Sequence, residues 1–260
     1  MNHVRDMFCT IINDEVEAYG FHHYRNMYYK TVGEALIGFN IYANRTYTLR
    51  FGCYPLCGEI VRHVGSFSDH EIVHILPQYR DTYLYVIPWG ENVSEAEQTA
   101  AWENRSKIYE DIAYQLADEL RTVLLPKLLK IDSTKAAFDF EKECCLAATL
   151  YQDKRFAAFT DSKMQTHTLL ALFADCFWNL QMRKVQKAEA CLENWLKSVK
   201  IRCEQDDFCG MTYYDQHYLE QKALCSMLSR GSSDEIEKYI AEREDITLKN
   251  FGLKRQKVIK

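Results

Sequence analysis

Composition and charge place this chain among ordinary folded proteins. Its 260 residues, 47% hydrophobic and 27% charged, suffice for one large domain or two small ones and argue against a disordered protein. The net charge is −5, and no stretch beyond residues 254–257 is rich in Lys and Arg, which excludes the usual footprint of a nonspecific nucleic-acid binder.

Cysteine usage and hydropathy indicate a cellular compartment. Ten cysteines are too few for a disulfide scaffold of this length, and their spacing is irregular. No apolar run approaches the roughly 18 residues that span a bilayer, and the polar opening segment does not resemble a secretory signal. We therefore predict a cytoplasmic protein with free thiols and no membrane partner.

The first third of the chain predicts one helix followed by strands. Apolar residues recur every three to four positions over residues 4–19, which is typical of an amphipathic helix, and Gly20 follows as a stop. Aromatic and β-branched runs then predict strands at residues 21–31, 34–43 and 46–54, with a further strand at 82–87. The short breaks between the first three runs are typical of hairpins.

From Ser94 onward the hydrophobic period becomes helical. Ser94 and Glu97 form a capping box before a long helix, which Pro126 is expected to end or bend, and Asp132 or Ser133 caps the next helix. Beyond residue 155 every segment is predicted to be helical, with a break near residues 182–184 and later helices at about 211–229 and 233–244.

The element pattern predicts the fold class and the domain organisation. We expect an α+β protein with an N-terminal antiparallel sheet and flanking helices, followed by an all-helical C-terminal region. The predicted domains are residues 1–130 and 131–260. Residues 169–199 are loosely similar to one tetratricopeptide unit, but no 34-residue period recurs, so an ordinary helical hairpin is the favoured interpretation.

A family resemblance rests on five short stretches, which are Tyr-Gly-Phe at 19–21 and the segments 26–30, 38–41, 47–52 and 124–129. Their order, over about residues 1–150, resembles a widespread bacterial domain of unknown function. Its members begin with a helix that leads to Gly-Phe and continue with aromatic strands and a Leu-Pro helix exit. The resemblance implies a helix–sheet–helix fold and a bacterial origin, and it brings no catalytic residues.

The sequence His70-Glu71-Ile-Val-His74 is the sharpest candidate for chemistry. On a helix, both imidazoles lie on one face and could bind one zinc ion, while Glu71 activates the bound water as a general base. Pro77 would keep such a helix short, and a catalytic zinc also needs a third protein ligand. The nearest downstream carboxylates are Glu91, Glu95 and Glu97.

The alternative for the same segment is a β-strand, since its β-branched content suits a sheet equally well. His70 and His74 would still share a face, but Glu71 would point away and the hydrolytic geometry would fail. This alternative, with core or surface histidines, is the favoured interpretation.

Other polar groupings carry weaker hypotheses. Cys53 and Cys57, with His63, have a spacing seen in structural zinc sites, but two further ligands are not evident. His22 and His23 are expected to be a surface pair, because neighbours on a strand face opposite sides. The acidic stretch at residues 242–245 is expected to be solvated or to lie at a helix end.

Two functions remain as hypotheses. Phosphate-binding glycine loops and the Gly-x-Ser-x-Gly elbow of serine hydrolases are absent from the sequence, whereas a Cys/His nucleophile pair could still form in space. The preferred hypothesis is a protein-binding or regulatory module without catalytic activity, whose partner is another protein, as the 17 Tyr and 4 Trp suggest. The alternative is a zinc-dependent hydrolase with His70, Glu71 and His74. An immunity component that acts by protein contact is a third, less specific possibility.

Overall fold

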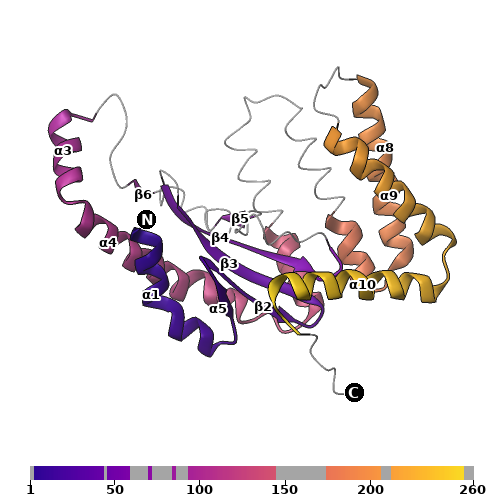
Figure 1. The fold of residues 1–260 in the computed structure, drawn as a ribbon, viewed down its shortest axis with the longest axis horizontal. Coiled ribbons are helices and arrows are strands. Elements are labelled where there is room, and N and C mark those ends of the chain that lie inside the picture. Colours follow the sequence, from indigo (N-terminus) through magenta and orange to yellow (C-terminus); the bar gives the residue numbers. More distant parts are fainter. Residues whose placement is uncertain are drawn as a thin grey trace. The chain divides into compact units, whose positions relative to one another are not determined.

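The computed structural model describes residues 3–43, 46–58, 70–71, 84–85, 93–144, 174–205 and 212–254. Packing divides the chain into unit 1, Met1–Cys53 with Arg62–Asp153, and unit 2, Tyr54–Val61 with Lys154–Lys260. Unit 1 holds an antiparallel sheet and helices, and the described remainder of the chain is mostly helical, which confirms the predicted α+β class (Figure 1). The boundary expected at residue 130 stays a prediction about independent folding.

The first helix, α1 (His3–Ala18), forms where the hydrophobic period predicts it. Its buried face consists of residues spaced four apart, which are Val4, Phe8, Ile12 and Val16. Each such fully buried side chain contributes about 2 kcal/mol. The helix ends in a turn in which Gly20 has a φ of 81°, a left-handed conformation that glycine adopts without strain, and Phe21 N–H donates to Val16 O at 3.3 Å.

The sheet follows directly. Its strands are β1 (His22–Tyr24), β2 (Met27–Val32), β3 (Ala35–Ala43), β4 (Thr46–Pro55), β5 (His70–Glu71) and β6 (Leu84–Tyr85). The order is β1-β2-β3-β4-β5, and β6 also pairs with β4. The prediction of one strand over residues 21–31 is wrong in detail, because this run folds back on itself as the β1–β2 hairpin. Its register places Tyr24 opposite Met27.

The helices after the sheet begin at a capping box. The Ser94 hydroxyl accepts from Glu97 N–H at 3.3 Å, as predicted, and starts α3 (Glu95–Glu103). In Figure 1, α3 extends from the start of α4 (Arg105–Glu119) away from the sheet, and none of its residues is buried. α4 continues through a π-helical turn, η3 (Leu120–Leu124), into α5 (Leu125–Leu128).

The π-turn lies just before Pro126, where the sequence predicts an end or a bend. Proline has no N–H to donate, and its ring collides with the carbonyl four residues earlier in a regular α-helix. A wider turn at this point relieves the collision, and the helix ends two residues later at Leu128. α4 packs on α1, and in η3 the Nε of Arg121 lies 2.7 Å from the Glu15 carboxylate of α1.

The helix at residues 134–144 fastens to the sheet of unit 1 by two polar contacts. Ser133 caps it, since its hydroxyl accepts from Ala136 N–H at 3.2 Å. Thr134 Oγ1 accepts from Glu34 N–H at 2.8 Å in the β2–β3 turn, and Glu141 accepts from Cys53 N–H at 3.3 Å in β4.

Unit 2 contains a helical hairpin and two further helices. The helix at residues 174–181 ends at the expected break, where Arg183 has a φ of 58°, and α8 (Val185–Gln205) follows. α9 (Thr212–Arg230) and α10 (Ser233–Phe251) complete the described part of this unit. α10 runs seven residues beyond its predicted end and stops at Gly252, whose φ is 66°. Among the described helices, none combines the length and the apolar character that a membrane span requires.

The core of unit 2 contains the predicted helix faces. Its buried members include Phe177, Leu180, Ala188, Leu192, Trp195 and Val199, with Leu224, Leu228, Ile236 and Ile240 from the later helices. Cys57, from the segment that follows β4, is fully buried in the same cluster.

Candidate functional site

The turn of the β1–β2 hairpin has an unusual backbone. Arg25 and Asn26 form a two-residue loop between Tyr24 and Met27. Arg25 has a φ of 60°, which lies in the left-handed region that side-chain-bearing residues rarely enter. This conformation costs about 1–2 kcal/mol for a residue other than glycine, so other contacts must hold the turn.

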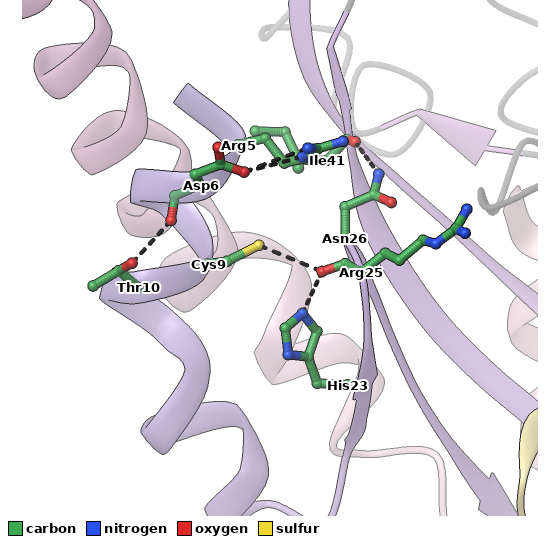
Figure 2. Close-up of polar contacts among 8 residues, drawn as sticks. All are labelled: Arg5, Asp6, Cys9, Thr10, His23, Arg25, Asn26 and Ile41. Carbon is green, nitrogen blue, oxygen red and sulfur yellow. Dashed lines mark hydrogen bonds and ion pairs between the residues drawn. The ribbon is translucent and has the colours of Figure 1, made fainter. Parts of the chain in front are cut away.

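Two side chains converge on the Arg25 carbonyl from different elements, as Figure 2 shows. The Cys9 thiol donates to it from α1 at 4.0 Å, and His23 Nε2 donates to it from β1. The Asn26 side-chain amide donates to Ile41 O at 3.0 Å and ties the turn to β3. The strained turn is therefore held from α1, β1 and β3 together.

A column of rings supports the same turn from within the sheet. The His23 ring stacks on Tyr28 with a centroid distance of 4.7 Å, and Tyr28 stacks on Phe39 at 5.0 Å. The Tyr28 hydroxyl donates to Asn13 Oδ1 in α1 at 2.5 Å. These contacts fix His23, and through His23 they fix the Arg25 carbonyl.

Burial decides what the Cys9 thiol can do chemically. It raises the pKa of Cys9 above its ordinary value, and a hydrogen bond with Tyr28 offsets only part of that rise. Burial likewise raises the pKa of Tyr28. The thiol therefore stays protonated, whereas a nucleophilic cysteine needs its thiolate. Because His23 Nε2 bonds the Arg25 carbonyl, the cluster positions a backbone turn rather than activating a nucleophile.

The residues around this hairpin turn are exposed, and most of them carry rings. We name Tyr19, His22, His23, Tyr24 and Arg25 the hairpin surface, because all five are exposed. Tyr19 and Tyr24 are 46% and 36% exposed, which is high for tyrosine. The Arg25 guanidinium lies over the Tyr24 ring at 5.3 Å, a cation–π contact that orients both side chains. The expectation that His22 and His23 form a surface pair is confirmed.

The proposed zinc motif is only partly described. His70 and Glu71 form β5, which pairs antiparallel with β4 and places His70 opposite Phe51 and Glu71 opposite Arg50. These two residues are extended, as the strand alternative predicts, and not helical. His74 lies outside the described residues, so a metal set of His70 and His74 with Glu71 as base stays a prediction.

The second zinc hypothesis concerned Cys53, Cys57 and His63, the last of which lies outside the described residues. Cys53 is buried in unit 1. In unit 2, the Cys57 thiol donates to Phe177 O at 3.5 Å, and burial raises its pKa. Within the described ranges, no group of three or more His, Cys, Asp or Glu side chains is arranged to hold a metal ion.

A buried polar chain inside unit 2 surrounds Cys57. The Cys57 N–H donates to Gln181 Oε1 at 2.7 Å, and the Gln181 amide donates to the Glu244 carboxylate at 2.5 Å. Arg243 Nε donates to Cys57 O at 3.4 Å. Glu244 belongs to a stretch that was expected to be solvated or to lie at a helix end, but it is buried, because α10 continues past it and turns it toward Gln181. This chain satisfies buried groups and anchors the segment after β4.

One buried carboxyl has no such partner. Glu119, at the junction of α4 and the π-turn, is 6% exposed, and its Oε2 has no hydrogen-bond partner among the described residues. Burial, with a smaller contribution from the Asp118 charge, raises its pKa to about 7. Glu119 is therefore partly protonated near neutral pH.

Sequence reasoning missed the hairpin residues Cys9, Arg25 and Tyr28. The Arg-Asn pair inside an aromatic run carries a weak signal, because asparagine favours turns, but arginine does not predict a left-handed backbone. Cys9 lies beside the buried stripe of α1 rather than in it. Its contact with Arg25 joins residues 16 positions apart, so no local pattern indicates it.

Comparisons with known proteins add no relative. A scan against family models found no matching family, and searches of curated proteins and of solved structures found no similar protein. The resemblance to a bacterial domain of unknown function therefore stays a prediction, and the geometry of the hairpin carries the functional argument.

Proposed function

We propose that this chain is a cytoplasmic protein-binding module of bacterial type, without catalytic activity, that engages its partner protein through the hairpin surface. The observation that supports this proposal most directly is the strained Arg25 turn. Strain of about 1–2 kcal/mol persists only where the surrounding structure holds it, and such positions concentrate at functional sites. Here the strain presents Tyr24 and Arg25 outward in a fixed arrangement.

The side chains on this surface are those that dominate binding energy in protein interfaces. Tyrosine and arginine are enriched among interface hot spots, because each gives a large contact area together with hydrogen-bonding groups. Their arrangement by cation–π contact and by the clamped turn lowers the entropy that is lost on binding. Seven cysteines of the described residues carry thiols that are not in disulfides, which supports the cytoplasmic location in this proposal.

Site-specific photo-crosslinking in the native host tests the proposal. A photoreactive phenylalanine analogue replaces Tyr24 in the full chain, and the matched control replaces Tyr114, an exposed tyrosine on α4 of the same unit. We expect a discrete crosslinked product from position 24 and none from position 114. The proposal is wrong if a folded chain gives no discrete product at position 24, or the same products at both positions.

A further inference from the structure

We infer that the hairpin surface recognises an acidic segment of the partner protein. This inference rests on the proposed function and adds the chemistry of the partner to it. Its basis is the contrast between a locally cationic hairpin and an acidic chain. A second ground is that the Arg25 guanidinium forms no ion pair with the described residues.

The charge around the hairpin runs against the charge of the whole chain. Residues 18–33 contain Arg25, Lys30 and two histidines, and no Asp or Glu, although the chain carries a net charge of −5. Lys30 contributes less, because it is partly buried, its Nζ donates to Tyr19 O at 3.3 Å, and burial lowers its pKa. Arg25 is therefore the main positive charge of this segment.

The Arg25 guanidinium is available to bind a carboxylate of a partner. Within the described part of the chain, its guanidinium contacts the Tyr24 ring and has no ion-pair partner. The nearby acidic side chain of α1 in Figure 2, Asp6, is paired with Arg5 at 3.4 Å. A guanidinium in this state presents a planar set of donors that matches a carboxylate in bidentate geometry.

A comparison inside the chain strengthens this point. Arg183 is the other described non-glycine residue with a positive φ, and it also occupies a turn. Its guanidinium is engaged, since Nε lies 3.0 Å from the Glu237 carboxylate and NH1 donates to Gln181 O at 2.6 Å. Two arginines thus share one strained backbone conformation, and the one on the hairpin surface lacks a described carboxylate.

The size of β1 indicates how the segment would bind. Strand β1 has only three residues, and backbone pairing along so short an edge offers a partner strand few hydrogen bonds. Side-chain recognition is the mode that fits this edge. Arg25 would take a carboxylate, while Tyr24 and Tyr19 would cover the apolar parts of the same segment.

Selection from a random peptide library tests the partner chemistry. Phage-displayed peptides of about a dozen residues, long enough to cross such a surface, are selected on the immobilised full chain. Parallel selections use Tyr24→Ala/Arg25→Ala and a matched control, Lys107→Ala/Tyr114→Ala, which also removes one cation and one exposed tyrosine from unit 1. Far-UV circular dichroism confirms that all three proteins are folded.

We expect the wild type and the control to enrich peptides that are clearly more acidic than the library, and the hairpin variant to lose them. A synthetic peptide of the enriched type should bind Arg25→Ala about tenfold more weakly than the wild type, and its affinity should fall with added salt. Neutral or basic peptides whose enrichment depends on Tyr24 and Arg25 would overturn the acidic inference and leave the proposed function standing.

Two other outcomes are equally informative. Enrichment that is the same on all three proteins, or absent from all, would overturn the proposed function together with the inference. Concentration-dependent dimerisation in analytical ultracentrifugation that Arg25→Ala abolishes would make a second copy of the chain the occupant, and would overturn the inference of a separate acidic partner.

Discussion

The buried carboxyl of Glu119 makes a quantitative prediction about stability and pH. In the folded chain its pKa is raised to about 7 from an ordinary value of 4.5, chiefly by burial. The folded state therefore holds this proton more tightly than the unfolded state between those two values. Stability contributed by the neutral acid is complete below about pH 4.5 and is lost as the pH rises through about 7. At 1.36 kcal/mol per pKa unit, the loss amounts to about 3 kcal/mol.

The substitution Glu119→Gln removes the ionisation while keeping the shape of the neutral acid. We expect wild type and variant to unfold at the same urea concentration near pH 4.5, and the variant to be about 3 kcal/mol more stable at pH 8. Urea unfolding followed by far-UV circular dichroism across this range measures the difference. Since the two units can unfold separately, the midpoint of the transition that the substitution moves is the quantity to compare.

Glu110→Gln is the matched control, because Glu110 is exposed on the same helix and the change in charge is identical. It should leave the dependence of stability on pH unaltered. If the curves of wild type and Glu119→Gln run parallel from pH 4.5 to 8, the Glu119 carboxylate is ionised at no extra cost in the folded protein. That result would refute the reasoning from its burial and from its missing partner.

Three further predictions concern the backbone and the buried polar chain. Gly33→Ala should lower the free energy of unfolding by at least about 2 kcal/mol, because Gly33 has a φ of 56° and a Cβ there would lie 2.6 Å from Thr134 Oγ1. Thermal unfolding measures this loss, and an unchanged melting temperature would contradict it. Arg25→Gly should stabilise unit 1 by about 0.5–1 kcal/mol in urea unfolding through relief of strain, and a loss of stability would show that the turn is not strained. Gln181→Leu should lower the free energy of unfolding by about 2–4 kcal/mol, since it removes the hydrogen bonds of Gln181 with Cys57 N–H and with the buried Glu244 carboxylate. An unchanged stability in urea unfolding would count against the role of these buried hydrogen bonds.

Local signals in the sequence predict the elements that depend on neighbouring residues. The stripe of α1, the capping boxes at Ser94 and Ser232 and the break before Val185 all follow from patterns within a few positions. The predicted end of α10 near residue 244 is wrong, because the helix continues to Phe251 through a stretch that was expected to be solvated or to lie at a helix end. Glu244 is instead buried against Gln181, 63 positions earlier. A pattern confined to the helix itself cannot contain that partner.

The strand prediction at residues 21–31 fails for a related reason. An aromatic and β-branched run favours extended backbone throughout, and only Asn26 in its middle favours a turn. In the folded chain, contacts of Cys9, His23 and the ring of Tyr28 hold the reversal there. A left-handed arginine is locally unfavourable, and it becomes the stable choice only when the contacts of α1 are included.

The energetics of the turn therefore connect the core of α1 to the hairpin surface. The hydrogen bond from His23 to the Arg25 carbonyl is worth about 1 kcal/mol net, and the thiol contact of Cys9 at 4.0 Å is weaker, so together they are comparable to the strain of about 1–2 kcal/mol. With so close a balance, weakening of these contacts loosens the turn, and one of them comes from α1. A cavity under α1 that shifts Cys9 would thus loosen the presentation of Tyr24 and Arg25 without touching either side chain. The hairpin surface is consequently a property of the packed helix and sheet together, and a peptide of residues 19–32 alone should not reproduce it.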